Sequence, residues 1–539
     1  MSKINTTHFE HSYTGTDPEN LKGHDLGAHA GTVQLFDGEE VILIPSPSKD
    51  PKDPLNYPSW KKWAIVILVS AYSSTAVILS SGMGAFYTKV VADYPGQEKK
   101  ANDLLTYPTL FMGLGNVISM PLALTIGRRP VFLGSIFLMT AAGLGCIFSR
   151  SLDVHIAFRD IMSLAAGQSE AISPMIISEI HFLHERSRRL SWFIFIQNVS
   201  VGVFFIATQF LVDAHGWRWW YGLFTIINGV VAILSVVFAA ETMWDRHDTD
   251  GSSPGTVQDG AEPPVTLSNF SAHRASLGPI PWHTGLGLMV KNPKWKKIPI
   301  FYTQVMQGFC IWPIMWVFLV NGIFLGLYVF QAATFATVLT EPPFSLAFVS
   351  LAYVQGAQII PCIVFLPLLG YGADYLVRAM SRRRGSVYNP EYRLIPFVVP
   401  VVVFVVCAVV YGQAAALTVS DATSSSSTSW GWPSIAVSYN GAFFAFLGAN
   451  VVGIAYAVDA FPSRTGPHLV LICAGRGLVS FGLSYATLPA VQALGYAGIM
   501  NVYAILGGVV SLFGVAVYFF GRRAREWAYR TFKIDEPRE

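Results

Sequence analysis

Charged side chains interrupt several apolar stretches of this sequence. Arg159 and Glu170 lie in one stretch, and Asp459 and Arg476 lie in two later ones. A charge at the centre of a bilayer costs roughly 2.5–3.5 kcal/mol on insertion scales, so charges that persist there usually mark a pathway for ions or solutes. Arg159 and Glu170 are eleven residues apart, which on a helix places them within about 20° of each other and about 16 Å apart. Both are expected to face one cavity.

Each of these charges has a candidate role and a simpler alternative. Glu170 can take up and release a proton, or it can hold two helices together. Arg159 can bind an anionic group or a partner acid, or its charged end can reach the membrane surface. Asp459 and Arg476 form a second candidate pair, in which Asp459 lies near the end of its stretch and is assigned to a gate. A buried arginine needs an acid, so Arg476 is expected to have one, and a structural role is slightly favoured.

Uncharged polar side chains in the apolar stretches are candidates for the lining of the same cavity. Each of them can equally well join two helices through a hydrogen bond. They are Asn198, Gln355, Gln358, Tyr439, Asn440 and Asn450.

Two other chemical signals are rejected. "HFLHE" at 181–185 has the spacing of metal ligands, but it lies in a polar turn followed by "RSRR". "WRWW" at 217–220 resembles a cation cage, yet at the end of an apolar stretch an aromatic membrane anchor is favoured. The sequence shows no nucleophile–base set, phosphate-binding loop or nucleic-acid module. We therefore expect no metal, no cofactor, no nucleic-acid partner and no enzymatic activity.

Composition shows what must position these residues. The chain has 539 residues, of which 52% are hydrophobic and 13% charged, whereas a soluble chain has about 25% charged residues. The apolar residues come in blocks of about 20, the length that crosses a bilayer as a helix. The sequence therefore predicts a polytopic membrane protein in a lipid bilayer.

Twelve such blocks are predicted, six on each side of a polar linker. The predicted parts are an N-terminal tail (1–62), a six-helix half (63–240), a linker (241–300), a second six-helix half (301–520) and a C-terminal tail (521–539). The spans are 63–86, 104–126, 130–149, 154–178, 190–212, 219–240, 301–330, 346–370, 394–416, 435–460, 467–489 and 498–520.

The distribution of cations predicts the orientation. Most Lys and Arg residues lie in alternate gaps and in the C-terminal "GRRAREWAYR". Cations of membrane proteins concentrate on the cytoplasmic side, so both termini are expected there. All five cysteines fall inside predicted spans, which disfavours a disulfide framework.

Several short motifs, in this order and at these positions, resemble the major facilitator superfamily over residues 60–525. The likeness is strongest to fungal twelve-span drug:proton antiporters, in the branch that includes polyamine and cation transporters. It implies an all-α membrane protein of twelve helices in two six-helix halves, with a site between them near the midplane. The motifs are "DPLNYPSWKKW" (53–63), "PLALTIGRRPV" (121–131), "SEIHFLHERSRR" (178–189), "GWRWWYGLF" (216–224), "ETMWDR" (241–246), "NPEYRL" (389–394) and "YAVDAFP" (456–462).

The first cytoplasmic loop departs from the family pattern, which reads G-x-L-A-D-R-x-G-R-R. Gly127, Arg128 and Arg129 fit and are assigned to a gate. Leu124 and Thr125 replace the acid and the arginine, and the acid normally locks one gate state through charge pairing. That lock is therefore in doubt in the first half.

A second copy of this motif, "GYGADYLVRAMSRRRG", follows the eighth span. It retains Asp374, with Arg378 four residues later on the same helical face. Asp374 is interpreted as the remaining gate acid, with an exposed loop carboxylate as the alternative.

The resemblance implies a proton-coupled transporter of a small organic molecule, most readily an exporter of a drug-like compound or secondary metabolite. The fifth span, "NVSVGVFFIATQF", lacks the Gly-Pro motif of drug antiporters. Uptake of an organic cation such as a polyamine therefore stays open, as does a nutrient sensor on a transporter scaffold. A monomer in the plasma membrane is expected, and substrate and direction are not determined by the sequence.

Overall fold

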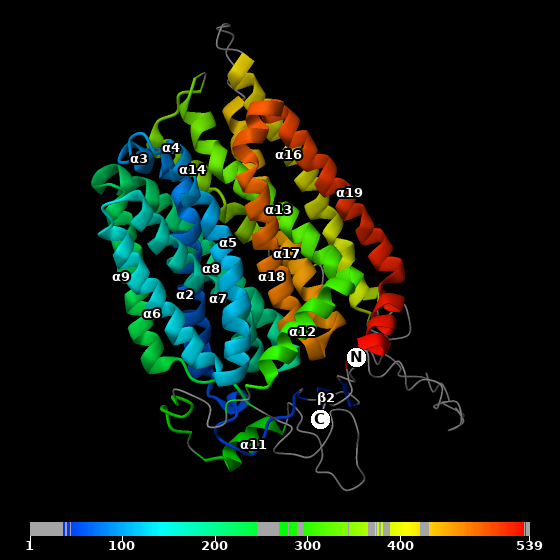
Figure 1. Ribbon diagram of the computed structural model, residues 1–539. Coiled ribbons are helices and arrows are strands. Elements are labelled where there is room, and N and C mark those ends of the chain that lie inside the picture. The colour runs from blue at the N-terminus through cyan, green and yellow to red at the C-terminus, as the bar shows by residue number, and fades with distance from the viewer. Residues whose placement is uncertain are drawn as a thin grey trace, which may run out of the picture.

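The apolar blocks become long helices that run side by side in the computed structural model (Figure 1). The structure describes residues 45–244, 269–278, 280–287, 295–342, 344–364, 389–420 and 431–532, with a few shorter pieces. Helices suit these blocks because lipid offers no hydrogen-bond partner, so each backbone group must be paired within its own segment. A two-residue pairing of β1 (Phe36–Asp37) with β2 (Glu40–Val41) lies outside the bundle.

The N-terminal half consists of six long helices and three short elements. The short elements, η3 (Gly82–Phe86), α3 (Tyr87–Ala92) and α4 (Glu98–Ala101), connect the first two long helices. The long helices are α2 (Ser59–Ser81), α5 (Asp103–Ile126), α6 (Arg128–Ile147), α7 (Leu152–Glu179), α8 (Leu183–His215) and α9 (Trp217–Phe238).

The C-terminal half repeats this layout with more breaks. The described part of its second pass is the helical segment Phe348–Val364, which includes α14 (Leu351–Gly356). The other elements are α12 (Lys297–Cys310), α13 (Trp312–Thr340), η5 (Pro390–Phe397), α16 (Val398–Ser420), α17 (Gly431–Ala460), η6 (Pro462–Arg464), α18 (Thr465–Tyr485) and α19 (Thr487–Phe532).

Several boundaries differ from the sequence prediction, most of all in the seventh and the last span. The predicted span 301–330 divides at Ile311, because Ile311 is extended and Pro313 starts a new helix, where its missing N–H costs nothing. Helix α19 continues to Phe532, past the predicted end of the last span at 520, and it is kinked at Gly495. The last helix therefore includes the first part of the predicted C-terminal tail.

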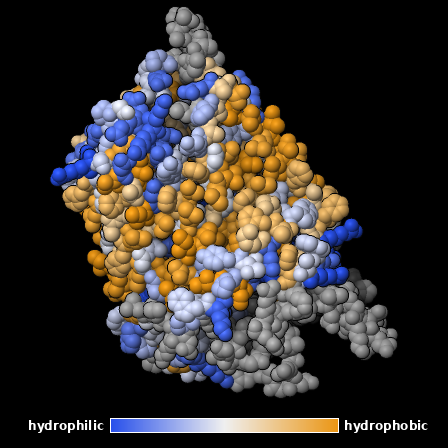
Figure 2. All heavy atoms as spheres, in the orientation of Figure 1, coloured by the Kyte–Doolittle hydropathy of each residue, from blue (hydrophilic) through white to orange (hydrophobic). Residues whose placement is uncertain are grey.

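Among the described residues, ten helices are long and apolar enough to cross a membrane. Helix α7 has 28 residues and carries Arg159 and Glu170, and the apolar segment Phe348–Val364 is shorter. With these two the passes number twelve, and the predicted fold class is confirmed. Figure 2 shows a broad apolar belt between more hydrophilic ends, to which exposed side chains such as Ile233, Ile505 and Phe519 contribute.

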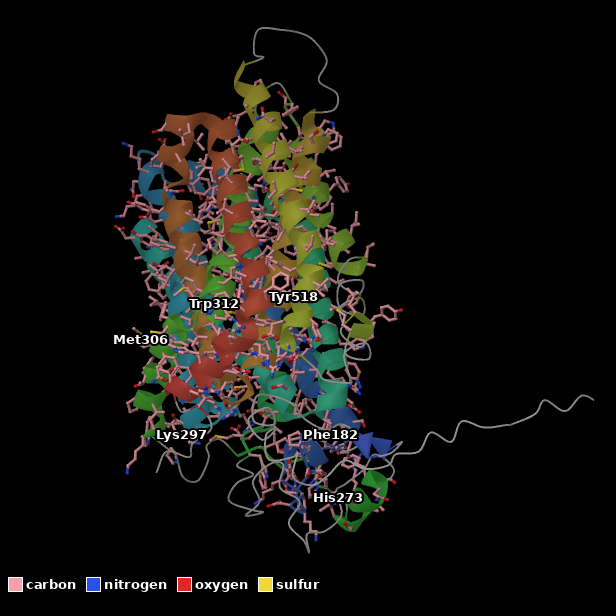
Figure 3. All side chains as sticks on the ribbon, turned by 90° about the vertical axis from the view of Figure 1, so that its right-hand side faces the viewer. Phe182, His273, Lys297, Met306, Trp312 and Tyr518 are labelled. Carbon is pink, nitrogen blue, oxygen red and sulfur yellow. The ribbon has the colours of Figure 1, made fainter. Side chains whose placement is uncertain are left out.

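The two ends of the bundle are distinct. We call the end at which α2 begins and α19 ends the tail end (Figure 1). In Figure 3, Phe182 and His273 lie at this end, and α12 rises from Lys297 through Met306 towards Trp312, the first residue of α13. At the opposite end the two halves meet where the Lys89 ammonium lies 4.0 Å from the Phe348 ring centroid.

Helices α5 and α7 approach each other unusually closely. A Cβ added at Gly167 of α7 would collide with the Met112 carbonyl oxygen of α5. On its other side α5 contacts α18, where a Cβ added at Gly477 would lie 2.8 Å from the Thr109 carbonyl oxygen. Small residues allow helix backbones to touch in this way. Helix α5 is thereby a thin spacer between α7 and α18.

Gly167→Ala is expected to lower the melting temperature of the purified protein, because backbone atoms must move to admit the methyl group. Overpacking of this kind costs about 1–3 kcal/mol. Gly134→Ala in α6 is the matched control, since an added Cβ there meets nothing within 4 Å. Equal melting temperatures for the two variants would contradict the close contact.

Candidate functional site

A cavity of about 430 Å³ lies between the two halves. Its wall is built from α2, α5, α7 and α8 on one side and from α13, the α14 segment, α17 and α18 on the other. It reaches Leu190 in α8 and Asp459 in the last turn of α17, both towards the tail end. Most of the predicted site residues line it: Arg159, Glu170, Asn198, Gln355, Tyr439, Asn450, Asp459 and Arg476.

An ion pair joins the halves across this cavity. The Arg476 guanidinium of α18 binds the Glu170 carboxylate of α7, and its Nη1 also donates to Asn450 Oδ1 at 2.8 Å. The Arg476 side chain is 6% exposed and the Glu170 side chain is 17% exposed. Asn116 Nδ2 of α5 lies 3.4 Å from Glu170 Oε2. The expected acid partner of Arg476 is therefore Glu170, which the thin α5 spacer brings within reach.

Asp459 and Arg476, the second candidate pair of charges, each bind another partner in the structure. Asp459 instead binds Arg393 at the start of the ninth pass, within the C-terminal half. Arg393 also lines the cavity. Arg393 lies just before the start of the predicted span 394–416 and was not among the predicted site residues. Its position follows from η5, which folds the residues after Asn389 back into the bundle.

Arg159 binds backbone carbonyl groups. Its guanidinium donates to the carbonyl oxygens of Leu104 at 2.7 Å, Leu79 at 3.0 Å and Ser80 at 2.7 Å, and to the Tyr221 hydroxyl at 3.0 Å. Leu79 and Ser80 lie in the last turn of α2, whose carbonyls have no partner within the helix. Arg159 is 1% exposed and satisfies them. In the described structure Arg159 therefore holds helix ends together, and it lines the same cavity as Glu170.

The predicted polar residues divide into two groups. Tyr439 and Gln355 lie in the wall, and Gln209 Nε2 of α8 approaches Gln355 Oε1 across the halves at 3.4 Å. Asn198 lines the cavity while its amide donates to the Ile194 carbonyl of its own helix. Asn440 does not line the cavity.

Asn440 holds two elements together instead. Its amide donates to the Val354 carbonyl of α14 at 3.1 Å and to the Ala436 carbonyl of α17 at 2.7 Å. Gln358 donates to the Tyr328 hydroxyl at 3.1 Å, and Tyr328 is a wall residue that the sequence prediction missed. An aromatic residue in an apolar run carries no local signal that separates cavity from core.

The predicted gate residues of the first half form a compact network at the tail end. Gly127 has a positive φ of 114°, which glycine adopts more readily than other residues because it has no Cβ. Helix α5 therefore ends and α6 begins on either side of this one residue. Arg128 donates to Glu179 of α7 through Nε at 3.0 Å and Nη2 at 2.5 Å. Thr242 donates to the same carboxylate at 2.7 Å. Glu179 is thus the acid of this network.

Arg129 and Glu241 stabilise the ends of neighbouring helices. The Glu241 carboxylate accepts from the backbone N–H groups of Arg128 and Arg129 at 2.9 and 3.1 Å, where the N-terminus of α6 favours an anion. The Arg129 guanidinium donates to the Val236 and Ala239 carbonyls at the C-terminus of α9, each at 2.7 Å. Arg128 and Arg129 are 8% and 5% exposed. Both cations are therefore buried structural donors.

The segment predicted as a polar linker, 241–300, also contributes to this network. Arg129 also donates to the Leu286 carbonyl, and the Glu241 N–H donates to Gly285 at 2.7 Å. Lys61 of α2 donates to the Trp282 carbonyl at 3.0 Å. Burial and the nearby Glu241 carboxylate raise the pKa of the Tyr57 phenol, which donates to the Glu241 carbonyl at 3.1 Å. The described linker residues are therefore held on the N-terminal half.

The missing motif acid has an apolar substitute. A Cβ added at Gly466, at the start of α18, would lie 3.7 Å from Leu124 Cδ1. The N-terminus of a helix attracts an acidic side chain, but here a methyl group of Leu124 lies near the N-terminus of α18. Asp374 and Arg378, the predicted gate pair of the second half, lie outside the described residues, so their pairing stays a prediction.

Within the described part of the chain, no group of three or more His, Cys, Asp or Glu side chains is arranged to hold a metal ion. The five cysteines are free thiols. The site itself contains paired charges and a cavity of about 430 Å³ between the two halves.

Comparison with known proteins identifies the family. The family model of the Major Facilitator Superfamily matches residues 63–466. Protein HOL1 of Saccharomyces cerevisiae is 20% identical, with 91% of each chain covered. The MFS-type transporter atr4 of Stereocaulon alpinum is 23% identical over 90% of this chain and 82% of its own. The efflux pump radE of Floropilus chiversii is 25% identical over 41% of this chain and 42% of its own.

Solved structures agree on the fold. A proton:xylose symporter, XylE, superposes with a TM-score of 0.54 at 14% identity, covering 86% of this chain and 96% of its own. A POT family transporter gives 0.57 at 11% identity, covering 88% and 100%. The chain therefore belongs to the Major Facilitator Superfamily, and it is a membrane transporter of small molecules and not an enzyme.

Proposed function

We propose that this protein exports a small organic molecule in exchange for protons, with Glu170 as the proton-binding group. The observation that carries the proposal is the Glu170–Arg476 pair, which joins α7 of one half to α18 of the other in the cavity wall. Several relatives of partial coverage are named efflux pumps, among them those of Floropilus chiversii and Fusarium oxysporum, which supports the outward direction.

The coupling follows from the charges. A proton on Glu170 removes its attraction for Arg476, and the contact between the halves then loses this ion pair. The halves can separate on one side, release the proton and re-form the pair. Because any linkage between two ligands is reciprocal, a substrate that favours the separated state also favours proton binding. In this proposal the tail end is cytoplasmic and the protein acts as a monomer in the plasma membrane.

The test uses everted membrane vesicles that contain the full-length protein, with an acidic lumen. The probes are a mixture of spermidine and neutral, anionic and cationic aromatic compounds, resolved by mass spectrometry. At least one compound is expected to accumulate above protein-free vesicles only while the pH gradient lasts. Accumulation with the opposite gradient would indicate proton symport. Absence of gradient-driven movement for every compound would refute the proposal and favour a sensor.

A further inference from the structure

Four aromatic rings in the C-terminal half form a nearly parallel series. Phe335 and Tyr439 are 4.7 Å apart between ring centroids at 9°, and Tyr439 and Tyr328 are 5.7 Å apart at 17°. Tyr328 and Phe446 follow at 6.2 Å and 3°. The rings alternate between α13 and α17. We call this series the ring ladder.

The ring ladder ends in the cavity. Tyr439, Tyr328 and Phe446 line the cavity, and Phe446 is only half-buried. The Arg476 guanidinium lies over the Phe446 ring, 5.7 Å from its centroid. The exposed end of the ladder is therefore next to the ion pair that joins the halves.

The charges of the wall do not suit a polycation. Both carboxylates among the described wall residues, Glu170 and Asp459, are already bound by arginines. With Arg159 included, the wall holds three guanidinium groups and two carboxylates, a formal sum of +1. A multiply charged amine would lose its hydration shell there without a free carboxylate to replace it, and like charges oppose its entry.

We infer that the cavity binds a planar aromatic compound that is uncharged or carries one negative charge, stacked on Phe446 at the end of the ring ladder. A ring in this position extends the parallel series and lies close to the Arg476 guanidinium. An anionic group on the compound shares that guanidinium with Glu170. This inference deepens the proposed function and rests on it for the cavity's role as the transport site.

The test measures binding of four probes by titration calorimetry to the full-length protein in lipid nanodiscs, with empty nanodiscs subtracted. Three probes share one ring system, namely 2-naphthol, 2-naphthoate and 2-naphthylmethylammonium, and the fourth is spermidine. Naphthol and naphthoate are expected to bind, the ammonium compound at least tenfold more weakly, and spermidine not at all. Equal or tighter binding of spermidine or of the ammonium compound would overturn the inference, as would the absence of binding by naphthol and naphthoate.

The residue test uses Phe446→Leu, which is expected to weaken naphthol and naphthoate binding about five- to tenfold, which corresponds to the loss of one aromatic contact of about 1–1.4 kcal/mol. Phe446→Tyr retains the ring and is expected to retain binding, which separates loss of stacking from misfolding. Phe519→Leu is the matched control, because Phe519 is 70% exposed on the membrane side of α19. Unchanged affinity in Phe446→Leu would refute the stacking site.

The two proposals fail in different ways. Gradient-driven accumulation of spermidine in vesicles would uphold proton-coupled transport and overturn the aromatic site. Binding of the naphthalene probes with no gradient-driven movement of any compound would uphold the aromatic site and refute the transport mechanism.

Discussion

Glu170→Gln is expected to abolish pH-driven accumulation of substrate while binding of substrate persists. The amide has nearly the shape of the carboxyl group but cannot carry the proton that the exchange requires. The measurement is accumulation in everted vesicles, with and without a pH gradient. Asp153→Asn, on the same helix, is the matched control. Its exposed carboxylate pairs with Lys100 at the end opposite the tail end, so transport should be unchanged.

A second variant separates coupling from stability. In Glu170→Gln alone, Arg476 keeps a buried charge without an acid, and breaking such a pair costs about 3–5 kcal/mol. The double variant Glu170→Gln/Arg476→Gln removes that charge and should recover thermal stability. If Glu170 is the proton carrier, the stable double variant still fails to accumulate substrate. Recovery of pH-driven accumulation in either variant would show that Glu170 only holds the helices together.

Arg128→Gln/Arg129→Gln is expected to lower the initial transport rate by at least about tenfold, with part of the protein still in the membrane, because breaking buried charge pairs costs several kcal/mol. Glu179 loses its arginine, and the C-terminal carbonyls of α9 lose their donor. Helices α6, α7 and α9, which these arginines join at the turn around Gly127, then no longer move as one body. The measurements are transport rate and the amount of protein in the membrane fraction.

The matched control for this variant is Arg522→Gln/Arg523→Gln. These two adjacent arginines are also at the tail end, but both are exposed, and Arg522 pairs with Glu526 one turn away. The control removes the same number of cations from the same side of the membrane. Any effect of lost charge on the orientation of the protein in the membrane should therefore be the same in both variants. Full activity in Arg128→Gln/Arg129→Gln, or an equal loss in the control, would count against a bracing role for the buried pair.

The sequence by itself determined the class of fold and the residues to suspect. Twelve apolar blocks must become helices because the bilayer leaves the backbone no other partner. The insertion cost of a charge is a local property of its block, so Glu170, Arg476 and Asp459 stood out without any tertiary information. The shared face of Arg159 and Glu170 followed from helical periodicity alone, and both residues do line the cavity.

Only the tertiary structure decided which of these charges are partners. Arg476 reaches Glu170 because glycines on α7 and α18 let both helices touch α5, and such contacts join segments hundreds of residues apart. Arg159 and Arg129 take backbone carbonyls at helix ends and in the linker. Every residue carries a carbonyl group, so no residue type marks those acceptors in the sequence. Helical periodicity fixes the direction of a side chain on its own helix, whereas its partner depends on which helix end packs beside it.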